Sequence, residues 1–154
     1  YKRQEKYRAD HRHYGMEKIC GDKMFPGIEG RTLDMTVTVQ DGSYTLFSIE
    51  VACDDEYATS YTYNKTTGML EIDRTYCGVT KDVVCVRKFK LADQSGKLQL
   101  RFLVDRQSVE LFVNGGQQVA TTAICTPLTA KDIRFHCDGE TSIDIDKYDI
   151  VIER

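Results

Sequence analysis

The chain has 154 residues, of which 41% are hydrophobic and 29% are charged, and its formal net charge is −3. This length allows one domain with a substantial core, and the composition is typical of a soluble globular domain rather than a disordered one. No apolar run approaches the roughly 20 residues of a membrane-spanning helix, so no membrane partner is expected. Acidic and basic residues are mixed along the chain, and the lack of a basic patch argues against nucleic acid as a partner.

The first 15 residues are polar and basic and contain few aliphatic side chains. They predict a linker, or a helical connector, that joins another module to the domain proper over residues 16–154. Because the chain begins at Tyr1 without an initiator methionine, we expect it to be a fragment of a longer protein. His11 and His13 could bind a metal, but two histidines without a third ligand nearby are more often solvated. We therefore expect neither a metal site nor a cofactor.

Apolar and polar side chains alternate over residues 31–39 and again over residues 44–52, with a turn at Asp41 and Gly42 between them. This pattern predicts a hairpin of two half-buried strands. Shorter strands are expected over residues 69–73 and 83–91. Near the end of the chain, alternating apolar residues predict three more short strands, separated by a turn at 137–140. These residues are Ile133, Phe135, Ile143, Ile145, Tyr148, Ile150 and Ile152.

Three tyrosines, Tyr57, Tyr61 and Tyr63, lead into the turn before residue 69. They could stack on the apolar face of a sugar while neighbouring carboxylates accept its hydroxyl hydrogen bonds. Alternatively they cover a sheet face with their hydroxyl groups in water, which is the commoner role of tyrosines in sheets.

The segment from Leu98 to Ile124 predicts three consecutive strands joined by two tight turns. Apolar residues recur at every second position up to Val104, and the polar residues 105–107 break the pattern before it resumes. The second break is Asn114, Gly115 and Gly116, residue types that tolerate the positive φ of a two-residue hairpin turn. Many short strands with such turns predict an all-β fold, an antiparallel sandwich of the jelly-roll or concanavalin-like type.

Six cysteines are scattered along the chain without a CxxC pair, so neither a zinc knuckle nor a redox motif is indicated. A domain of this size does not need disulfides, and a free cysteine packs as a small apolar residue. Reduced thiols are therefore expected, and they suggest a cytoplasmic location.

Three segments resemble the C-terminal β-sandwich module of glycoside hydrolase family 32, which includes invertases, fructanases and sucrose-6-phosphate hydrolases. They are VDRQSVELFVNGG at 104–116, followed by a small-residue run to Ile124 and Pro127, then LEIDRTYCG at 70–78 and IDIDKYDIVI at 143–152. The order of the three matches is that of the family. The resemblance implies a β-sandwich that accompanies an N-terminal β-propeller catalytic domain in the same protein.

In the family that the chain resembles, the catalytic acids lie in the propeller, in motifs similar to WMNDPNG, RDP and EC. This chain has no tryptophan, no Asp-Pro and no Glu-Cys, so no catalytic residue is expected in it. A glycosidase needs two carboxylates about the scissile bond, but any two of 24 acidic residues could be nominated. As candidates for carbohydrate binding we name Arg74, Asp105 and Glu110.

The resemblance thus implies a non-catalytic accessory domain of a β-fructofuranosidase-type hydrolase that stabilises the propeller and assists in binding fructose-containing saccharides. One alternative is an independent fructan-binding module. Another is a lectin-like or laminin-G-like interaction domain, because VELFVNG also occurs in such sandwiches. The substrate of the parent enzyme, whether sucrose, sucrose phosphate, inulin or levan, would be selected in the pocket of the propeller, which is not in this sequence.

The strand assignment can be tested at Leu111, which we expect to face the core. The Leu111→Ala variant should lose about 2–5 kcal/mol of unfolding free energy, because a buried leucine leaves a cavity when it is truncated. Urea denaturation measures this loss, and full retention of stability would contradict the predicted strand face.

Overall fold

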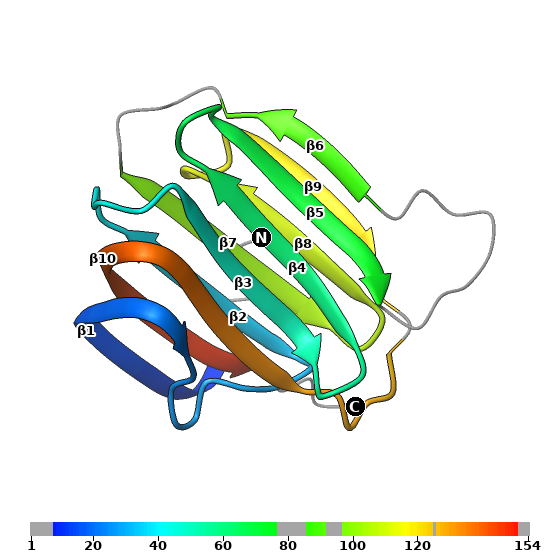
Figure 1. The fold of residues 1–154 in the computed structure, drawn as a ribbon. Helices are drawn as coiled ribbons and strands as arrows, with labels where there is room; N and C mark the ends of the chain where they lie inside the picture. The colour runs from blue at the N-terminus through cyan, green and yellow to red at the C-terminus, as the bar shows by residue number, and fades with distance from the viewer. Residues whose placement is uncertain (1–7, 77–85, 92–96, 125, 151–154) are drawn as a thin grey trace.

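The computed structural model describes residues 8–76, 86–91, 97–124 and 126–150, and these form ten antiparallel strands (Figure 1). In chain order the strands are β1 (Arg8–Lys23), β2 (Leu33–Val39), β3 (Leu46–Cys53), β4 (Ala58–Asn64), β5 (Met69–Tyr76), β6 (Val86–Lys90), β7 (Leu98–Asp105), β8 (Ser108–Val113), β9 (Gln118–Ala123) and β10 (Asp132–Ile150). Among these residues, no helix has the length and apolar character needed to span a bilayer.

The strands are hydrogen-bonded in the order β6-β5-β4-β3-β10-β2-β7-β8-β9, and β1 pairs with β10. The sheet is strongly curled, so that β3 to β6 form one layer and β2, β7, β8 and β9 form the other (Figure 1). Strand β10 belongs to both layers, because residues 132–137 pair with β3 and residues 143–149 pair with β2. Its other edge pairs with β1 over nearly its whole length.

The core lies between the two layers. Tyr61 of β4 and Phe102 of β7 meet in a T-shaped contact with their ring centroids 5.1 Å apart, and both residues are buried. Leu111 is completely buried, as expected from the alternation in β8. The predicted all-β antiparallel sandwich is confirmed.

The prediction of a linker or helical connector at the N-terminus is wrong for residues 8–15, which belong to strand β1; residues 1–7 lie outside the described part. The sequence is too polar to form a core element by itself, but β1 does not need an apolar face of its own. Its main chain pairs with β10 from Arg8 opposite Ile150 to Lys23 opposite Phe135. Backbone hydrogen bonds, rather than side-chain burial, hold most of this edge strand.

The predicted hairpin of residues 31–39 and 44–52 is also wrong, although both strands exist. Strands β3 and β2 pair with successive parts of β10, residues 132–137 and 143–149, and not with each other. The three last short strands are in fact one strand of 19 residues. Its buried residues keep one alternation throughout, and the Asp-Gly signal at 138–139 marks a bend rather than a turn.

Two glycines permit a close crossing at this bend. A Cβ atom on Gly139 would lie 2.7 Å from the Ser43 oxygen, and a Cβ on Gly42 would lie 2.3 Å from the Glu140 oxygen. Asp138 also accepts hydrogen bonds from the main-chain nitrogens of Thr45 and Leu46, at 2.8 and 3.0 Å. The connection from β2 to β3 therefore crosses β10 in direct contact with its backbone.

The three strands predicted over residues 98–124 are confirmed as β7, β8 and β9. The expected positive φ angles occur at Asn114, Gly115 and Gly116, at 49°, 74° and 91°. The loop differs in length from the prediction, because Val113 pairs with Gln118 and leaves four residues between the strands. The expected strand over 83–91 is confirmed for residues 86–90; residues 83–85 lie outside the described part.

We expect Gly139→Ala to destabilise the protein by about 1–3 kcal/mol, because the new methyl group would overlap main-chain atoms that cannot move independently. Thermal and urea unfolding measure the loss. Gly15→Ala in β1 is the matched control, since its Cβ would meet only side-chain atoms of His13 and Asp144. Equal stability of the two variants would contradict the close crossing.

Candidate functional site

Two of the three residues predicted to bind carbohydrate lie together. Asp105 at the end of β7 and Glu110 on β8 are exposed and line one pocket with Leu103, Ser108 and Ile150 among others. The pocket has a volume of about 140 Å³, whereas sites for drug-sized ligands occupy about 300–1,000 Å³. It could therefore hold a single polar group rather than enclose a saccharide.

The third predicted residue, Arg74, is in the other layer. It lies at an irregularity of β5, where the pairing with β4 advances by three residues on β5, from Asp73 to Tyr76, and by only two residues on β4. The Nε atom of Arg74 is buried. The structure does not bring Arg74 together with Asp105 and Glu110. Sugar binding by these residues stays a prediction.

The tyrosines do not form a stacking surface. Tyr61 and Tyr63 are buried in the core, and only Tyr57 is partly exposed. Neither interpretation drawn from the sequence holds for Tyr61, whose hydroxyl group is also buried. Burial raises the pKa of Tyr61 to about 12, while the Thr122 hydroxyl and the guanidinium groups of Arg87 and Arg74 oppose the shift.

A larger groove, of about 620 Å³, lies where the edge strands β6 and β9 approach each other. Side chains bridge the two edges: Arg87 donates to the Thr121 oxygen at 2.7 Å, and Gln118 donates to the Lys90 oxygen at 2.8 Å. These bonds join the two layers on the side opposite the β1–β10 ribbon, so the groove is explained by the closure of the sandwich.

A buried ion pair lies on the outer face of the β2–β7 layer. Arg101 donates from Nε and Nη2 to the two carboxylate oxygens of Asp34, at 2.9 and 2.6 Å. Asp34 is 1% exposed and Arg101 is 8% exposed. Planar two-point bonding pairs the two charges, so this ion pair joins β2 to β7 rather than offering a reactive group.

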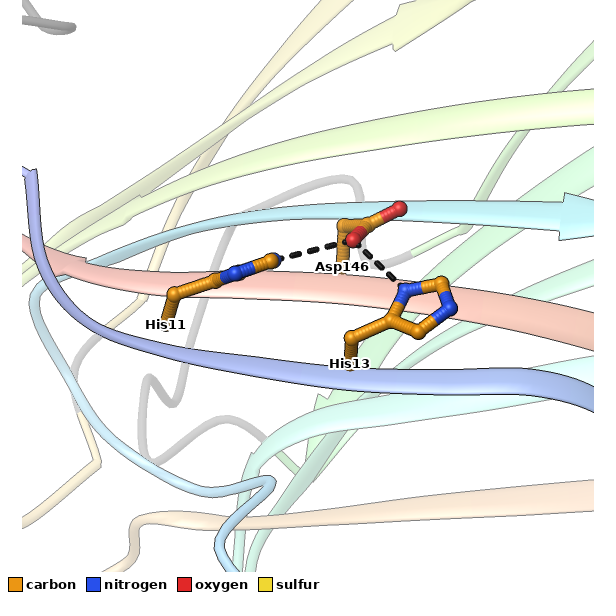
Figure 2. A group of neighbouring side chains, drawn as sticks. All are labelled: His11, His13 and Asp146. Carbon is orange, nitrogen blue, oxygen red and sulfur yellow. Dashed lines mark hydrogen bonds and ion pairs between the residues drawn. The ribbon is translucent and has the colours of Figure 1, made fainter.

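A third polar cluster joins the two ends of the described chain. His11 Nε2 and His13 Nδ1 both donate to Asp146 Oδ1, at 3.0 and 2.8 Å, and Figure 2 shows the two rings of β1 converging on that carboxylate of β10. The three groups could hold a metal ion, since their ligand atoms lie within 4.8 Å of one another. Partial burial of Asp146 acts to raise its pKa, but the hydrogen bonds from His11 and His13 outweigh it and lower the pKa.

Local backbone geometry sets this cluster. The pairing of β1 with β10 shifts by one residue between Ala9 and Arg12 and again between Tyr14 and Glu17. Asp10 and Met16, inside these two bulges, have φ angles of 48° and 49°. Bulges re-aim side chains and favour positive φ; the first irregularity contains His11, and the second follows His13.

The sequence argued against a metal because no third ligand lies near His11 and His13 in the chain. The fold supplies a third ligand, Asp146, which is 133 positions from His13. Only the i, i+2 spacing of the histidines, which places both on one face of a strand, was visible beforehand. That signal required β1 to be recognised as a strand. Asp146 could not be chosen from the sequence, because Asp144 and Asp149 lie beside it.

Two of the three described thiols are buried and protonated. Cys53 and Cys137 are buried and Cys20 is exposed, and all three are free. Burial raises the pKa of Cys53 to about 12, and it also raises that of Cys137, so both stay protonated near neutral pH.

A family model described as "Glycosyl hydrolases family 32 C terminal" matches residues 3–151. The chain belongs to this family. The family 32 resemblance seen in the three sequence segments is thereby confirmed, and it extends over the N-terminal strand as well.

Among curated family 32 relatives, the sucrose-6-phosphate hydrolase of Staphylococcus xylosus is 32% identical over 125 residues, which cover 79% of this chain and 25% of that protein. The levanase of Bacillus subtilis is 30% identical over 102 residues, which cover 64% of this chain and 15% of that protein. The chain thus spans a quarter or less of the length of these relatives.

Solved structures of family 32 enzymes share the fold. The exo-inulinase from Aspergillus awamori matches with a TM-score of 0.79 and 24% identity, over 95% of this chain and 30% of that one. The sucrose-6-phosphate hydrolase from Lactobacillus gasseri matches with a TM-score of 0.78 and 19% identity, over 97% of this chain and 30% of that one.

The burial of the Tyr61 hydroxyl predicts a pH dependence of stability. Because the folded-state pKa of about 12 is above the ordinary value of 10, the protein should be fully stabilised below pH 10 and lose stability as the pH rises toward 12. Tyr61→Phe should weaken this alkaline loss. Unfolding midpoints measured from pH 8 to 12 test it, with Tyr57→Phe as the control, and identical slopes for all three proteins would contradict the assignment.

Proposed function

We propose that this family 32 domain is a non-catalytic accessory domain of a β-fructofuranosidase-type hydrolase. The proposal rests on the share of this chain, and of its relatives, that the matches cover. The family model for the C-terminal part matches nearly the whole chain, while curated relatives are at least four times as long as the segment that they share with it. A glycosidase that hydrolyses terminal fructosyl bonds would hold its two catalytic carboxylates in the remaining part.

The proposed partner is an N-terminal β-propeller catalytic domain of the same protein. The solved family 32 chains leave about 70% of their length outside the match, which is room for such a domain. The role of the sandwich would be to stabilise the propeller. The free thiols of Cys20, Cys53 and Cys137 support a cytoplasmic location for the whole protein.

A second candidate function is fructan binding by the sandwich itself. It is favoured by the juxtaposition of Asp105 and Glu110 around one pocket, since carboxylates accept hydrogen bonds from sugar hydroxyl groups. The small volume of that pocket favours a contribution to a larger site over an independent module. A lectin-like or laminin-G-like interaction domain has no comparable support.

The proposal is tested by mixing the chain with the separately produced catalytic domain of the same protein. We expect the chain alone to hydrolyse neither sucrose nor inulin, and its addition to raise the melting temperature of the catalytic domain. Hydrolysis by the chain alone, or an unchanged melting temperature at saturating concentration, would count against the accessory role.

Fructan binding by the sandwich itself is tested by calorimetric titration with fructose, sucrose, and inulin and levan oligosaccharides. Cellulose and xylan oligomers are the controls. Saturable heat with fructans alone would favour a fructan-binding module. In that case Asp105→Asn and Glu110→Gln should weaken binding, while Arg74→Gln in the other layer should leave it unchanged.

A further inference from the structure

The cluster of His11, His13 and Asp146 is separate from the pocket at Asp105 and Glu110. We propose that it binds a zinc ion through His11 Nε2, His13 Nδ1 and Asp146 Oδ1, with water completing the coordination. The inference does not depend on the proposed accessory role, because it concerns only the ribbon of β1 and β10.

The spacing of the three ligand atoms suits a tetrahedral ion. Zinc bonds of about 2.0–2.2 Å place neighbouring ligand atoms roughly 3.3–3.5 Å apart. Asp146 Oδ1 is already 3.0 Å from His11 Nε2 and 2.8 Å from His13 Nδ1. The two ring nitrogens lie at most 4.8 Å apart, so small side-chain rotations would bring all three atoms to bonding distance.

Access and charge also favour a cation. The three side chains are 44%, 55% and 44% exposed, so an ion can enter from solvent. Of the described basic residues, the two that adjoin the cluster in sequence point away from it: Arg12 is near Gly27, and the Lys147 ammonium donates to the Gly27 oxygen at 3.0 Å. Residues alternate across a strand, so both basic side chains are on the face opposite the cluster.

The surroundings hold the rings in place before any ion binds. Tyr148 stacks on His11 with 4.3 Å between ring centroids and 9° between planes. A Cβ at Gly15 would lie 3.2 Å from His13 Nε2, so the glycine leaves room for that ring. The flanking bulges at Asp10 and Met16 fix the main chain on both sides, and such irregularities are common beside functional sites.

The ligand types select the class of ion. Imidazole nitrogen with one carboxylate suits zinc and its first-row neighbours, whereas calcium and magnesium prefer six or more oxygen ligands. Three protein ligands leave a position open to water or to an outside group. A bound ion would link β1 to β10 and raise the melting temperature, because it binds the folded state alone.

The test is calorimetric titration of the protein with zinc chloride under reducing conditions, with magnesium chloride as the ionic control. We expect a saturable zinc site that His13→Ala and Asp146→Asn each weaken by more than roughly 10-fold, as loss of a ligand should cost at least as much as loss of an outer-shell partner. Cobalt substitution provides a second readout, since the visible absorption of bound cobalt should disappear in the same variants.

The matched control is His136→Ala. His136 Nδ1 bonds Asp22 Oδ1 at 2.7 Å on the same ribbon, but this pair has a single histidine. Zinc binding should be unchanged in this variant, which keeps every cysteine. No saturable binding, binding that survives His13→Ala in a folded variant, or equal loss in His136→Ala would overturn the proposal.

Discussion

The pairing of β10 with three other strands is the constraint on which the architecture depends. One edge of β10 bonds β3 in its first part and β2 in its second, and the other edge bonds β1. The strand therefore joins the two layers of the sandwich through continuous main-chain hydrogen bonds. Because its buried side chains keep a single alternation through the bend, both layers enclose one core.

Side-chain hydrogen bonds add further connections between segments of the sandwich, beyond the main-chain pairing of β10. Arg31 is buried and donates to the oxygens of Thr126 and Pro127, at 3.3 and 2.7 Å, and also bonds the Arg106 oxygen. A guanidinium group has five donors in a fixed plane, which suits it to gather several carbonyl groups at once. At the edges of the two layers, Arg87 and Gln118 bridge β6 and β9.

Local patterns in the sequence predicted the strands well and their partners less well. Alternation identified β2, β3, β7, β8 and the buried face of β10, since period two follows directly from strand geometry. It could not show that β10 separates β2 from β3, because nothing in residues 31–52 encodes a strand arriving from residue 132. Strand β1 was missed because most of its side chains are polar and main-chain pairing with β10 holds most of it.

Some residues of the candidate sites could be grouped from the sequence, and others are brought together only by the fold. Asp105 and Glu110 are five positions apart on one hairpin, and their proximity follows from local register. Arg74 was grouped with them by motif resemblance, and the fold places it in the other layer. The cluster of His11, His13 and Asp146 needed tertiary structure, because its members come from the two ends of the described chain.

The pairing of β1 with β10 has a consequence for biosynthesis. His11 and Asp146 are 135 positions apart, so β1 leaves the ribosome long before its partner exists. At about 5–20 residues per second the delay is on the order of ten seconds. During that time the N-terminal segment has no strand to pair with, and its many charged residues reduce the hazard of pairing with another nascent chain.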